Sequence, residues 1–362
     1  MTPDILVIGG GVFGLSVAYA AHRAGATVKV LEAEQPGAGS SGGVVGALTP
    51  HAPTRWRPMM DFQFAALRAL PGRVQDLRQQ TGQDAGYRRP GRAAPISTEK
   101  ALSRARADCA AAPEVWGDQG SMEILPVADF PWIDPGTAPF GVLYDTVSAL
   151  ISPRDYLTAL IAALPVGTVQ SGRVTELCPG PVARTPEGDT AAGNIVIAAG
   201  WQGWDLLPAP LRGRGVKGQA ALLRANPGEM PVVTHDGLYI IPHQKGVAVG
   251  STSEKAWDHP HVDEALDALL IKAAGAIPAL ADAPVIERWS GIRPKPPGRE
   301  PVVGRVPGKP GFWIAGGGFK IGFGIAHAVG DAIVAAILNR EAPIPVPDSF
   351  DPAALMAVSD VG

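Results

Sequence analysis

Short apolar runs near both ends of the chain predict buried strands, each followed by glycines and then by a helix-forming segment. Residues 4–8 are expected to form the first strand and 15–21 to continue a helix. A second strand is expected over 27–31. Near the other end, 312–315 predicts a strand, and a helix is expected to run through Asn339 after three glycines. The order strand, glycines, helix thus occurs twice, which is typical of α/β proteins.

Between these segments the pattern predicts a mixture of helices and short strands. Helices are expected over 59–80, 98–112, 153 onward and 262–275, and strands over 169–177, 194–200 and several times within 216–252, with proline-rich loops over 124–138. Pro71 is expected to begin a new turn rather than lie inside a helix. Residues 85–97 are expected to form a hairpin, and Ser152 to cap the helix that begins at Pro153.

The first glycines form the pattern G-x-G-x-x-G over residues 9–14. In such a turn Gly9 allows the tight bend, Gly11 allows close approach of a pyrophosphate, and Gly14 allows the helix to pack on the strand. The free N–H groups of the helix N-terminus favour phosphate. Glu32 ends the second strand 18 residues after Gly14, where a carboxylate can bind a ribose 2′-OH. This arrangement predicts FAD or NAD rather than NADP.

A second glycine turn favours FAD over NAD. The second glycine turn, at Gly316–Gly318, would aim a helix N-terminus at a flavin, whose N1–C2 carbonyl region gains negative charge on reduction. Residues 37–48 are almost all small, which suggests backbone lying close against a flat ligand. Gly200 ends a strand at a point where a sheet typically meets a nucleotide.

Composition narrows the class of protein. The chain has 362 residues, 46% hydrophobic and 18% charged, which fits a well-packed protein of one or two joined domains. No apolar run reaches the roughly 20 residues of a membrane helix, so no integral membrane segment is expected. The first residues show no basic region or cleavage site, so a cytoplasmic protein is expected. Two cysteines and a net charge of −3 argue against a disulfide framework and against nucleic acid as partner.

Six motifs together carry a resemblance that is more specific than the first turn alone. They are residues 7–14, 46–52, 216–219, 239–242 with 249–252, 289–294 and 315–322. With these motifs the chain resembles the FAD-dependent amino-acid and amine oxidase family that includes glycine oxidase, D-amino-acid oxidase and monomeric sarcosine oxidase. The resemblance extends from residue 4 to about 340 and is strongest to glycine oxidase.

The resemblance implies an α/β fold in which a Rossmann-like FAD-binding domain carries a β-rich substrate domain, as in D-amino-acid oxidase. The FAD-binding domain is expected over 1–80, 141–212 and 290–345, the substrate domain over 81–140 and 213–289, and a C-terminal tail over 346–362. The residues implied to bind FAD are Gly9, Gly11, Val12, Phe13, Gly14, Glu32, Ala33, Ser40, Ser41, Val45, Gly46, Ala47, Val174, Gly200, Gly318, Phe319, Lys320, Ile321, Gly322, Phe323 and Gly324. Cys109 and Cys178 lie away from the cysteine that binds flavin covalently in sarcosine-type relatives, so FAD is expected to be non-covalent.

Four residues are implied to act on the substrate. Arg293, in the G-I-R-P motif, would hold the substrate carboxylate, because a guanidinium can bind a carboxylate bidentately. Tyr239 would reach the same carboxylate or the amine, and Lys320 matches a cationic position of the family. His51 would border the flavin ring. The alternatives are a surface arginine, a core tyrosine, a solvated lysine at a helix start and a structural histidine.

The implied reaction is oxidation of the C–N bond of a small amino acid such as glycine, sarcosine or a D-amino acid. Hydride passes to flavin N5, the resulting imine is hydrolysed to an oxo acid, and O2 is reduced to H2O2. No side-chain base is required, because orientation and electrostatics suffice. Alternatives are a dehydrogenase that reduces a quinone or an electron-transfer protein, a flavin protein acting on another amine or on none, and a relative of a tRNA-modifying oxidase domain.

No metal site is expected; the His and Asp residues of 258–263 are expected to cap the helix near 262. The exact substrate, the metabolic pathway and the choice between monomer and homo-oligomer stay open.

Overall fold

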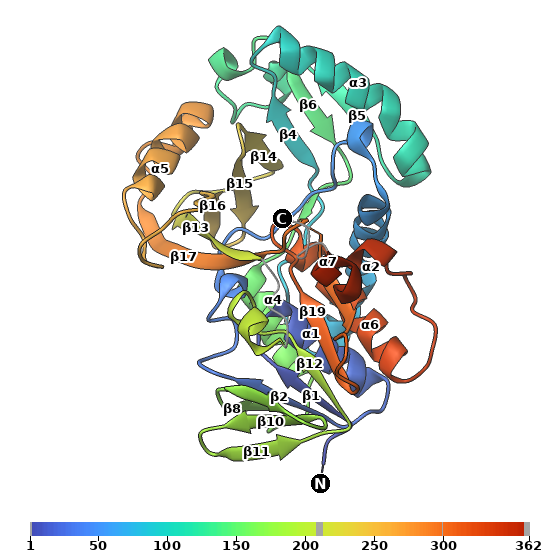
Figure 1. The fold of residues 1–362 in the computed structure, drawn as a ribbon. Coiled ribbons are helices and arrows are strands. Elements are labelled where there is room, and N and C mark those ends of the chain that lie inside the picture. Colours follow the sequence, from blue (N-terminus) through green and yellow to red (C-terminus); the bar gives the residue numbers. More distant parts are fainter. Residues whose placement is uncertain (1, 208–212, 299, 358–362) are drawn as a thin grey trace.

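The computed structural model describes residues 2–207, 213–298 and 300–357. Its lower part in Figure 1 contains a six-stranded sheet with the order β18–β19–β12–β1–β2–β8. The strands are β1 (Ile5–Ile8), β2 (Val28–Glu32), β8 (Val169–Ser171), β12 (Asn194–Ile197), β18 (Val302–Arg305) and β19 (Phe312–Gly316). All neighbours are parallel except β18, which runs antiparallel to β19. Every residue of β1 is buried, as expected for a strand covered on both faces.

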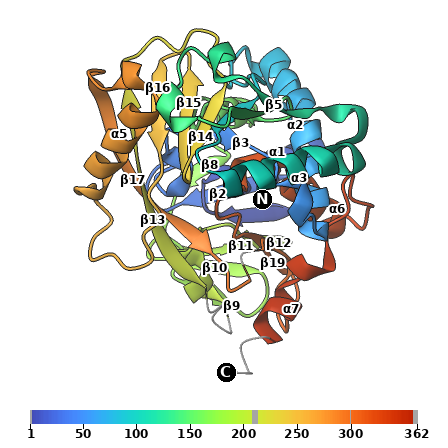
Figure 2. The ribbon, with the colours of Figure 1, turned by 90° about the horizontal axis from the view of Figure 1, so that it is seen from above.

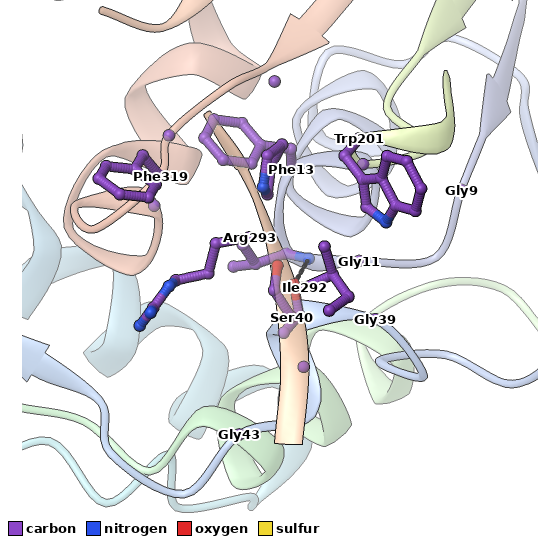
Figure 3. A pocket seen from close by; sticks show the side chains of 18 of the residues that line it. Gly9, Gly11, Phe13, Gly39, Ser40, Gly43, Trp201, Ile292, Arg293 and Phe319 are labelled. Carbon is purple, nitrogen blue, oxygen red and sulfur yellow. Dashed lines mark hydrogen bonds between the residues drawn. The ribbon is translucent and has the colours of Figure 1, made fainter. Parts of the chain in front are cut away.

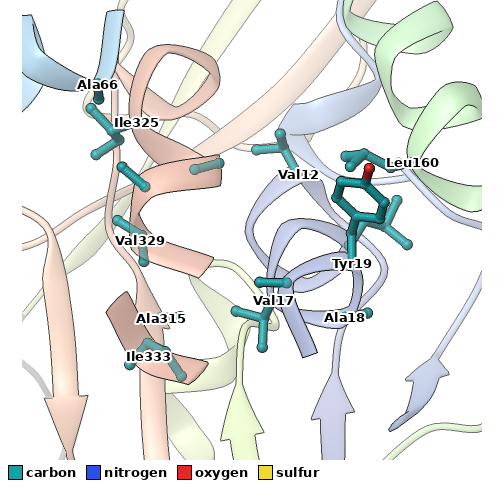
Figure 4. Packing of buried hydrophobic residues seen from close by; sticks show 14 of the residues in the cluster. Val12, Val17, Ala18, Tyr19, Ala66, Leu160, Ala315, Ile325, Val329 and Ile333 are labelled. Atoms are coloured by element: carbon teal, nitrogen blue, oxygen red, sulfur yellow. The ribbon is translucent and has the colours of Figure 1, made fainter. Parts of the chain in front are cut away.

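Helices cover one face of this sheet, and a small sheet covers the other. The covering helices are α1 (Val12–Arg23), α2 (Pro58–Thr81), α4 (Pro153–Ala162) and α6 (Gly322–Ile337), which share one hydrophobic core. Figure 4 shows Val12 and Val17 of α1 beside Ile325, Val329 and Ile333 of α6. Burial of each such aliphatic side chain contributes about 1.5–3 kcal/mol. The opposite face packs against β9 (Glu176–Cys178), β10 (Val182–Thr185) and β11 (Gly188–Ala191).

The upper part contains an eight-stranded sheet with the order β17–β13–β16–β15–β14–β4–β6–β5. Its strands are β4 (Arg92–Pro95), β5 (Met122–Leu125), β6 (Val142–Asp145), β13 (Arg214–Leu223), β14 (Val232–His235), β15 (Leu238–His243), β16 (Gly246–Gly250) and β17 (Val285–Lys295). Helix α5 (Ala265–Ala276) packs on its outer face, and α3 (Glu99–Trp116) lies beside β5 (Figures 1 and 2). A two-stranded sheet, β3 (Ala47–Leu48) with β7 (Ala149–Leu150), lies between the two large sheets.

The α/β fold class is as expected, but three local predictions were wrong. Pro71 lies inside α2, because the helix buries one continuous face, including Leu67, Leu70 and Val74, and packing there outweighs the hydrogen bond lost at proline. Residues 85–97 form no hairpin: β4 pairs with β6 and β14, which are distant in sequence. The segment 169–177 is not one strand, since β8 and β9 belong to different sheets.

Helix starts were predicted more closely. Thr98 caps α3 by accepting a hydrogen bond from the Ala101 N–H at 3.1 Å, although α3 runs on to Trp116. Ser152 occupies the N-cap position of α4, but its hydroxyl bonds to the Asp155 carboxylate at 2.7 Å instead of capping the backbone. Asp263 accepts from the Ala265 N–H at the start of α5, which begins at Ala265.

The division into two domains stays a proposal. The strand pairings suggest a change to two of its boundaries. β6 and β17 both belong to the eight-stranded sheet, although the expected boundaries at 140/141 and 289/290 place β6 in the FAD-binding part and cut through β17. We propose that both strands be counted with the substrate domain. The segment expected as a tail contains α7 (Pro352–Ala357), and the buried Phe350 packs edge-on against Phe62 of α2. Across the described ranges, no helix is both long and apolar enough to span a bilayer.

Candidate active site

A cavity of about 1090 Å³ lies where the carboxyl ends of the central parallel strands face the eight-stranded sheet. Its wall contains the ends of β1, β2, β12 and β19 on one side and residues of β15 and β17 on the other. In open α/β sheets, ligands bind outside the carboxyl ends of the strands. Figure 3 shows Phe13, Trp201 and Phe319 around this space, with the Arg293 side chain extending away from the Gly9–Gly11 turn.

The first glycine turn is built so that only glycine fits at two of its positions. Gly9 has a φ of 108°, and a Cβ there would lie 2.6 Å from the Ala198 carbonyl oxygen. A Cβ on Gly14 would overlap the carbonyl oxygen of Gly9. The contact with Gly14 lets α1 start directly behind the strand, so the N-terminal N–H groups of α1 face the cavity. The Ser41 hydroxyl accepts from the Val12 N–H at 3.0 Å.

Glu32 lies at the end of β2 and lines the cavity. One of its carboxylate oxygens accepts from the Gly10 N–H at 2.6 Å and the other from the Glu34 N–H at 2.9 Å. A carboxylate offers about four acceptor positions, so these two bonds leave capacity for ribose hydroxyls. The side chain therefore ties β2 to the glycine turn and still presents acceptors to the cavity.

The second glycine turn has a different geometry from the first. β19 ends at Gly316, but α6 begins only at Gly322, not directly after the three glycines as expected. A Cβ on Gly318 would lie 2.6 Å from the Phe13 ring, so this glycine gives room for the aromatic side chain. Phe319 has a positive φ of 39°, and the intervening residues present side chains to the cavity.

All but one of the residues expected to bind FAD or substrate line this single cavity. The exception is Gly14, which lies beneath the turn and supports it. The sequence reasoning missed several lining residues, including Thr49, Gln63, Arg173, Trp201, Ser251, Trp257 and Trp289. Trp201 directly follows Gly200, and Ser251 and Trp289 lie within quoted motifs, so their positions could have been found. Trp257 lies in a long loop and had no signal in the sequence.

Arg293, on β17, is held at the cavity wall by acceptors of the protein itself. One terminal nitrogen donates to the Ser251 hydroxyl at 2.6 Å, and the other donates to the carbonyls of Thr252 and Lys217 at 2.5 and 3.3 Å. The buried Nε–H has no hydrogen-bond partner among the described residues. Burial lowers the pKa of the guanidinium to about 10, partly opposed by the charge of Glu254, so Arg293 is charged at neutral pH.

The other three candidate residues, Tyr239, His51 and Lys320, line the same cavity. The Tyr239 hydroxyl lies 3.4 Å from the Thr49 hydroxyl, within hydrogen-bonding distance. His51 Nδ1 lies 2.5 Å from the Gln63 side-chain oxygen, and the Gln63 amide donates to the Thr49 carbonyl at 3.1 Å. Lys320 is exposed but lines the cavity, with its ammonium 5.8 Å from the centroid of the Phe319 ring. The Arg293 guanidinium lies 5.9 Å from the same centroid.

With this geometry in view, comparison with known proteins decides the family. The family model described as "FAD dependent oxidoreductase" matches residues 4–336. This chain belongs to that family. As a member it is an enzyme and FAD is its cofactor.

Two relatives show how far this FAD-dependent oxidoreductase resembles glycine oxidases. The glycine oxidase of Pseudomonas putida KT2440 is 30% identical over 354 residues, covering 91% of this chain and 92% of the relative. The crystal structure of glycine oxidase from Geobacillus kaustophilus has a TM-score of 0.87 at 23% identity, covering 96% of this chain and 98% of that one.

A further solved structure of the same fold is that of an oxidase named for a different substrate. The structure of iminodiacetate oxidase from Chelativorans sp. BNC1 has a TM-score of 0.83, also at 23% identity, and covers 96% of this chain and 98% of that one. The fold of this FAD-dependent oxidoreductase is therefore shared by proteins with different substrates, so fold alone does not choose the substrate.

Proposed function

We propose that this FAD-dependent oxidoreductase oxidises the C–N bond of a small amino acid, with O2 as electron acceptor. The observation that carries the proposal is Arg293: a buried, charged guanidinium at the cavity wall, held in place by acceptors of the protein. Such a fixed positive charge would attract a substrate carboxylate and could form a charge-assisted hydrogen bond to it. A small amino acid also accords with the names of the glycine oxidase relatives.

The residues present fit FAD. The Gly11 N–H and the N–H groups of the first turn of α1 that have no partner among the described residues would hold the diphosphate, and Glu32 would accept from the ribose hydroxyls. The small residues Gly46 and Gly318 line the cavity where a Cβ would meet Ile151 and Phe13, which leaves room for a flat ring system. When bound, FAD supplies the acceptor for the substrate's α-hydrogen as hydride.

The protein's own part in the reaction is binding and orientation. Arg293 would fix the substrate carboxylate, and the Tyr239 hydroxyl would bond to the carboxylate or the amine. The aromatic residues Trp201, Trp257 and Trp289 line the cavity and limit access of water, which strengthens the charge–charge interaction with Arg293. No side chain is needed as a base if the amine binds uncharged, because a positioned α-hydrogen is then all that the step requires.

Replacement of Arg293 tests the function. Arg293→Ala should cost about 2–5 kcal/mol in transition-state binding, mostly through KM, and Arg293→Lys should recover only part of it. Arg288→Ala is the matched control, since Arg288 lies on the same strand but is exposed and pairs with Asp267. The double variant Arg293→Ala/Lys320→Ala tests whether Lys320 holds the carboxylate alone. Equal kcat/KM in all FAD-loaded variants would refute the carboxylate assignment.

Substrate and acceptor are tested with the same protein. Glycine, sarcosine, D-amino acids and L-proline are screened for anaerobic bleaching of the flavin, and oxygen uptake with peroxide release is then measured. Reduction by an amino acid without oxygen uptake would favour the dehydrogenase. No bleaching by any amino acid would contradict the proposal.

We propose that FAD is bound non-covalently in a cytoplasmic enzyme. Both cysteines are free thiols, and neither Cys109 nor Cys178 lines the cavity. Acid precipitation should therefore release intact FAD into the supernatant. A yellow pellet would show a covalent link.

A further inference from the structure

A cluster of charged residues lies behind Arg293, on the face of β13 that points away from the cavity. Lys217 is only 1% exposed. Its ammonium donates to the Asp263 carboxylate and lies 3.5 Å from that of Glu254. Gln219, fully buried two residues along the same strand, donates to both carboxylates, at 3.0 Å to Glu254 and 2.5 Å to Asp263. None of these four residues lines the cavity.

This cluster is connected to Arg293 through the backbone that holds the guanidinium. Lys217 exchanges both backbone hydrogen bonds with Glu254, at 2.9 and 3.0 Å. The Thr252 hydroxyl accepts from the Gln219 N–H at 2.9 Å and donates to the Glu254 carboxylate. The carbonyls of Lys217 and Thr252 are the two that accept from Arg293. The charged cluster therefore fixes both acceptors.

The charges in this region balance only as a group of four. Lys217 and Arg293 are positive, and Glu254 and Asp263 are negative. Burial alone would lower the pKa of the Lys217 ammonium, but its bonds to Asp263 and Glu254 raise the pKa above the ordinary value. The bonds from Lys217 and Gln219 lower the pKa of Asp263 to about 2. Lys217, Asp263 and Arg293 are thus charged at neutral pH, and Glu254 acts electrostatically on Arg293 by raising its pKa.

We propose that Lys217 is a positioning residue that neutralises Glu254 and Asp263 and so keeps Arg293 available for the carboxylate of the substrate. The inference rests on the proposed role of Arg293. Without the lysine charge, two carboxylates would face one guanidinium, and in a partly buried site they would compete with the substrate carboxylate for it. Lys217 itself would touch neither substrate nor cofactor.

A charge-rescue experiment tests the proposal. Lys217→Met removes the charge and keeps much of the side-chain volume, and Lys217→Met/Glu254→Gln removes one charge of each sign. KM for the reducing amino acid is measured with kcat. Binding of glycolate, which keeps the carboxylate and replaces the amine by a hydroxyl, is measured by titration of the visible flavin spectrum. FAD content and the thermal unfolding midpoint report on folding.

Lys217→Met should raise KM and the glycolate Kd at least about tenfold, with kcat changed by less than about threefold. The double variant should return KM and Kd to within about threefold of wild type, and Lys217→Arg should resemble wild type. If Lys217→Met does not fold, the double variant, which balances the charges, decides alone. A double variant whose KM and glycolate Kd stay as high as those of Lys217→Met would overturn the proposal, because the weakened binding would then not come from the unbalanced charge of Glu254. Rescue of the unfolding midpoint without rescue of the glycolate Kd would overturn it too, because it would show a purely structural role for Lys217.

Different experimental results would contradict the proposed function and the positioning role of Lys217. An unchanged KM in Arg293→Ala would refute the carboxylate role of Arg293. A raised KM in Arg293→Ala together with an unchanged glycolate Kd in Lys217→Met would leave that role intact and refute only the positioning role of Lys217.

Discussion

The two strand–glycine–helix segments of the cavity look alike in sequence but present different groups to the ligand. In the first, α1 begins at Val12, directly behind Gly11, so the cavity receives backbone N–H groups. In the second, α6 begins only at Gly322, and the residues before it place the side chains of Phe319 and Lys320 at the cavity. The first suits an anion, and the second suits an aromatic ring with a cationic neighbour.

The difference comes from what each turn packs against. Gly14 lies on the carbonyl of Gly9 within its own turn, which allows the helix to start at once. Gly318 lies on the ring of Phe13, a residue of the other turn, so the backbone passes around that ring before α6 can begin. Gly14 thus makes room for a contact within its own turn, whereas Gly318, like Gly9 beside the Ala198 carbonyl, makes room for a segment distant in sequence.

Alanine at Gly14, in the first turn, and at Gly322, the first residue of α6, should give the largest difference in stability. Gly14→Ala should destabilise the protein by about 3 kcal/mol or more, because the new methyl group would overlap the Gly9 carbonyl. Gly322→Ala should change stability by less than about 1 kcal/mol, since its methyl would meet Phe13 at 3.4 Å and alanine favours helix. Thermal unfolding and FAD content measure both. A small loss of stability in Gly14→Ala would show that the first turn is not as tightly packed as described.

The next largest expected effect is a loss of stability in acid, caused by a buried histidine of α6. His327 of α6 is buried, its Nε2–H donates to the Ala66 carbonyl at 3.0 Å, and burial lowers its pKa to about 3. The unfolded chain binds this proton below about pH 6.5, so the free energy of unfolding should fall as pH drops from 6.5 towards 3. The loss should be at most about 1.4 kcal/mol per pH unit.

His327→Gln should flatten this part of the pH profile of stability. The exposed His259→Gln is the control and should leave the profile unchanged. Denaturant unfolding at a series of pH values provides the measurement. Equal slopes in wild type and His327→Gln would show that other groups cause the acid sensitivity.

The smallest expected effect concerns the carboxylate beside the first turn. Glu32→Ala should weaken FAD retention by roughly 1–3 kcal/mol if a charged hydrogen bond to ribose is lost. Because Glu32 also accepts from Gly10, unfolding of the FAD-free protein is measured in parallel. Glu34→Ala is the control, since Glu34 lines the same cavity but is largely exposed. Unchanged FAD retention in Glu32→Ala would remove this residue from the proposed cofactor site.

Local sequence was a good guide wherever the determining contacts are local. The strand before Gly9 and the helix after it depend on residues within one or two turns, so their patterns could be interpreted directly. The same patterns failed at Pro71 and at 85–97, where long-range packing and pairing decide. The cluster around Lys217 was also missed, because its partners Glu254 and Asp263 are about forty residues away in sequence.

By itself the sequence determined the first glycine turn and the strands that lead into both glycine segments, because backbone conformation and burial leave a periodic signal in the chain. The residues expected to bind FAD or substrate came from the resemblance to the oxidase family, and they are a part of those that line the cavity. Only the tertiary structure decided how those residues act together. It gave Gly318 its contact with Phe13, placed Arg293 against Ser251 and Thr252, and buried Lys217 between two carboxylates. Such contacts join segments far apart along the chain, and their energies depend on distance and burial, which no local pattern records.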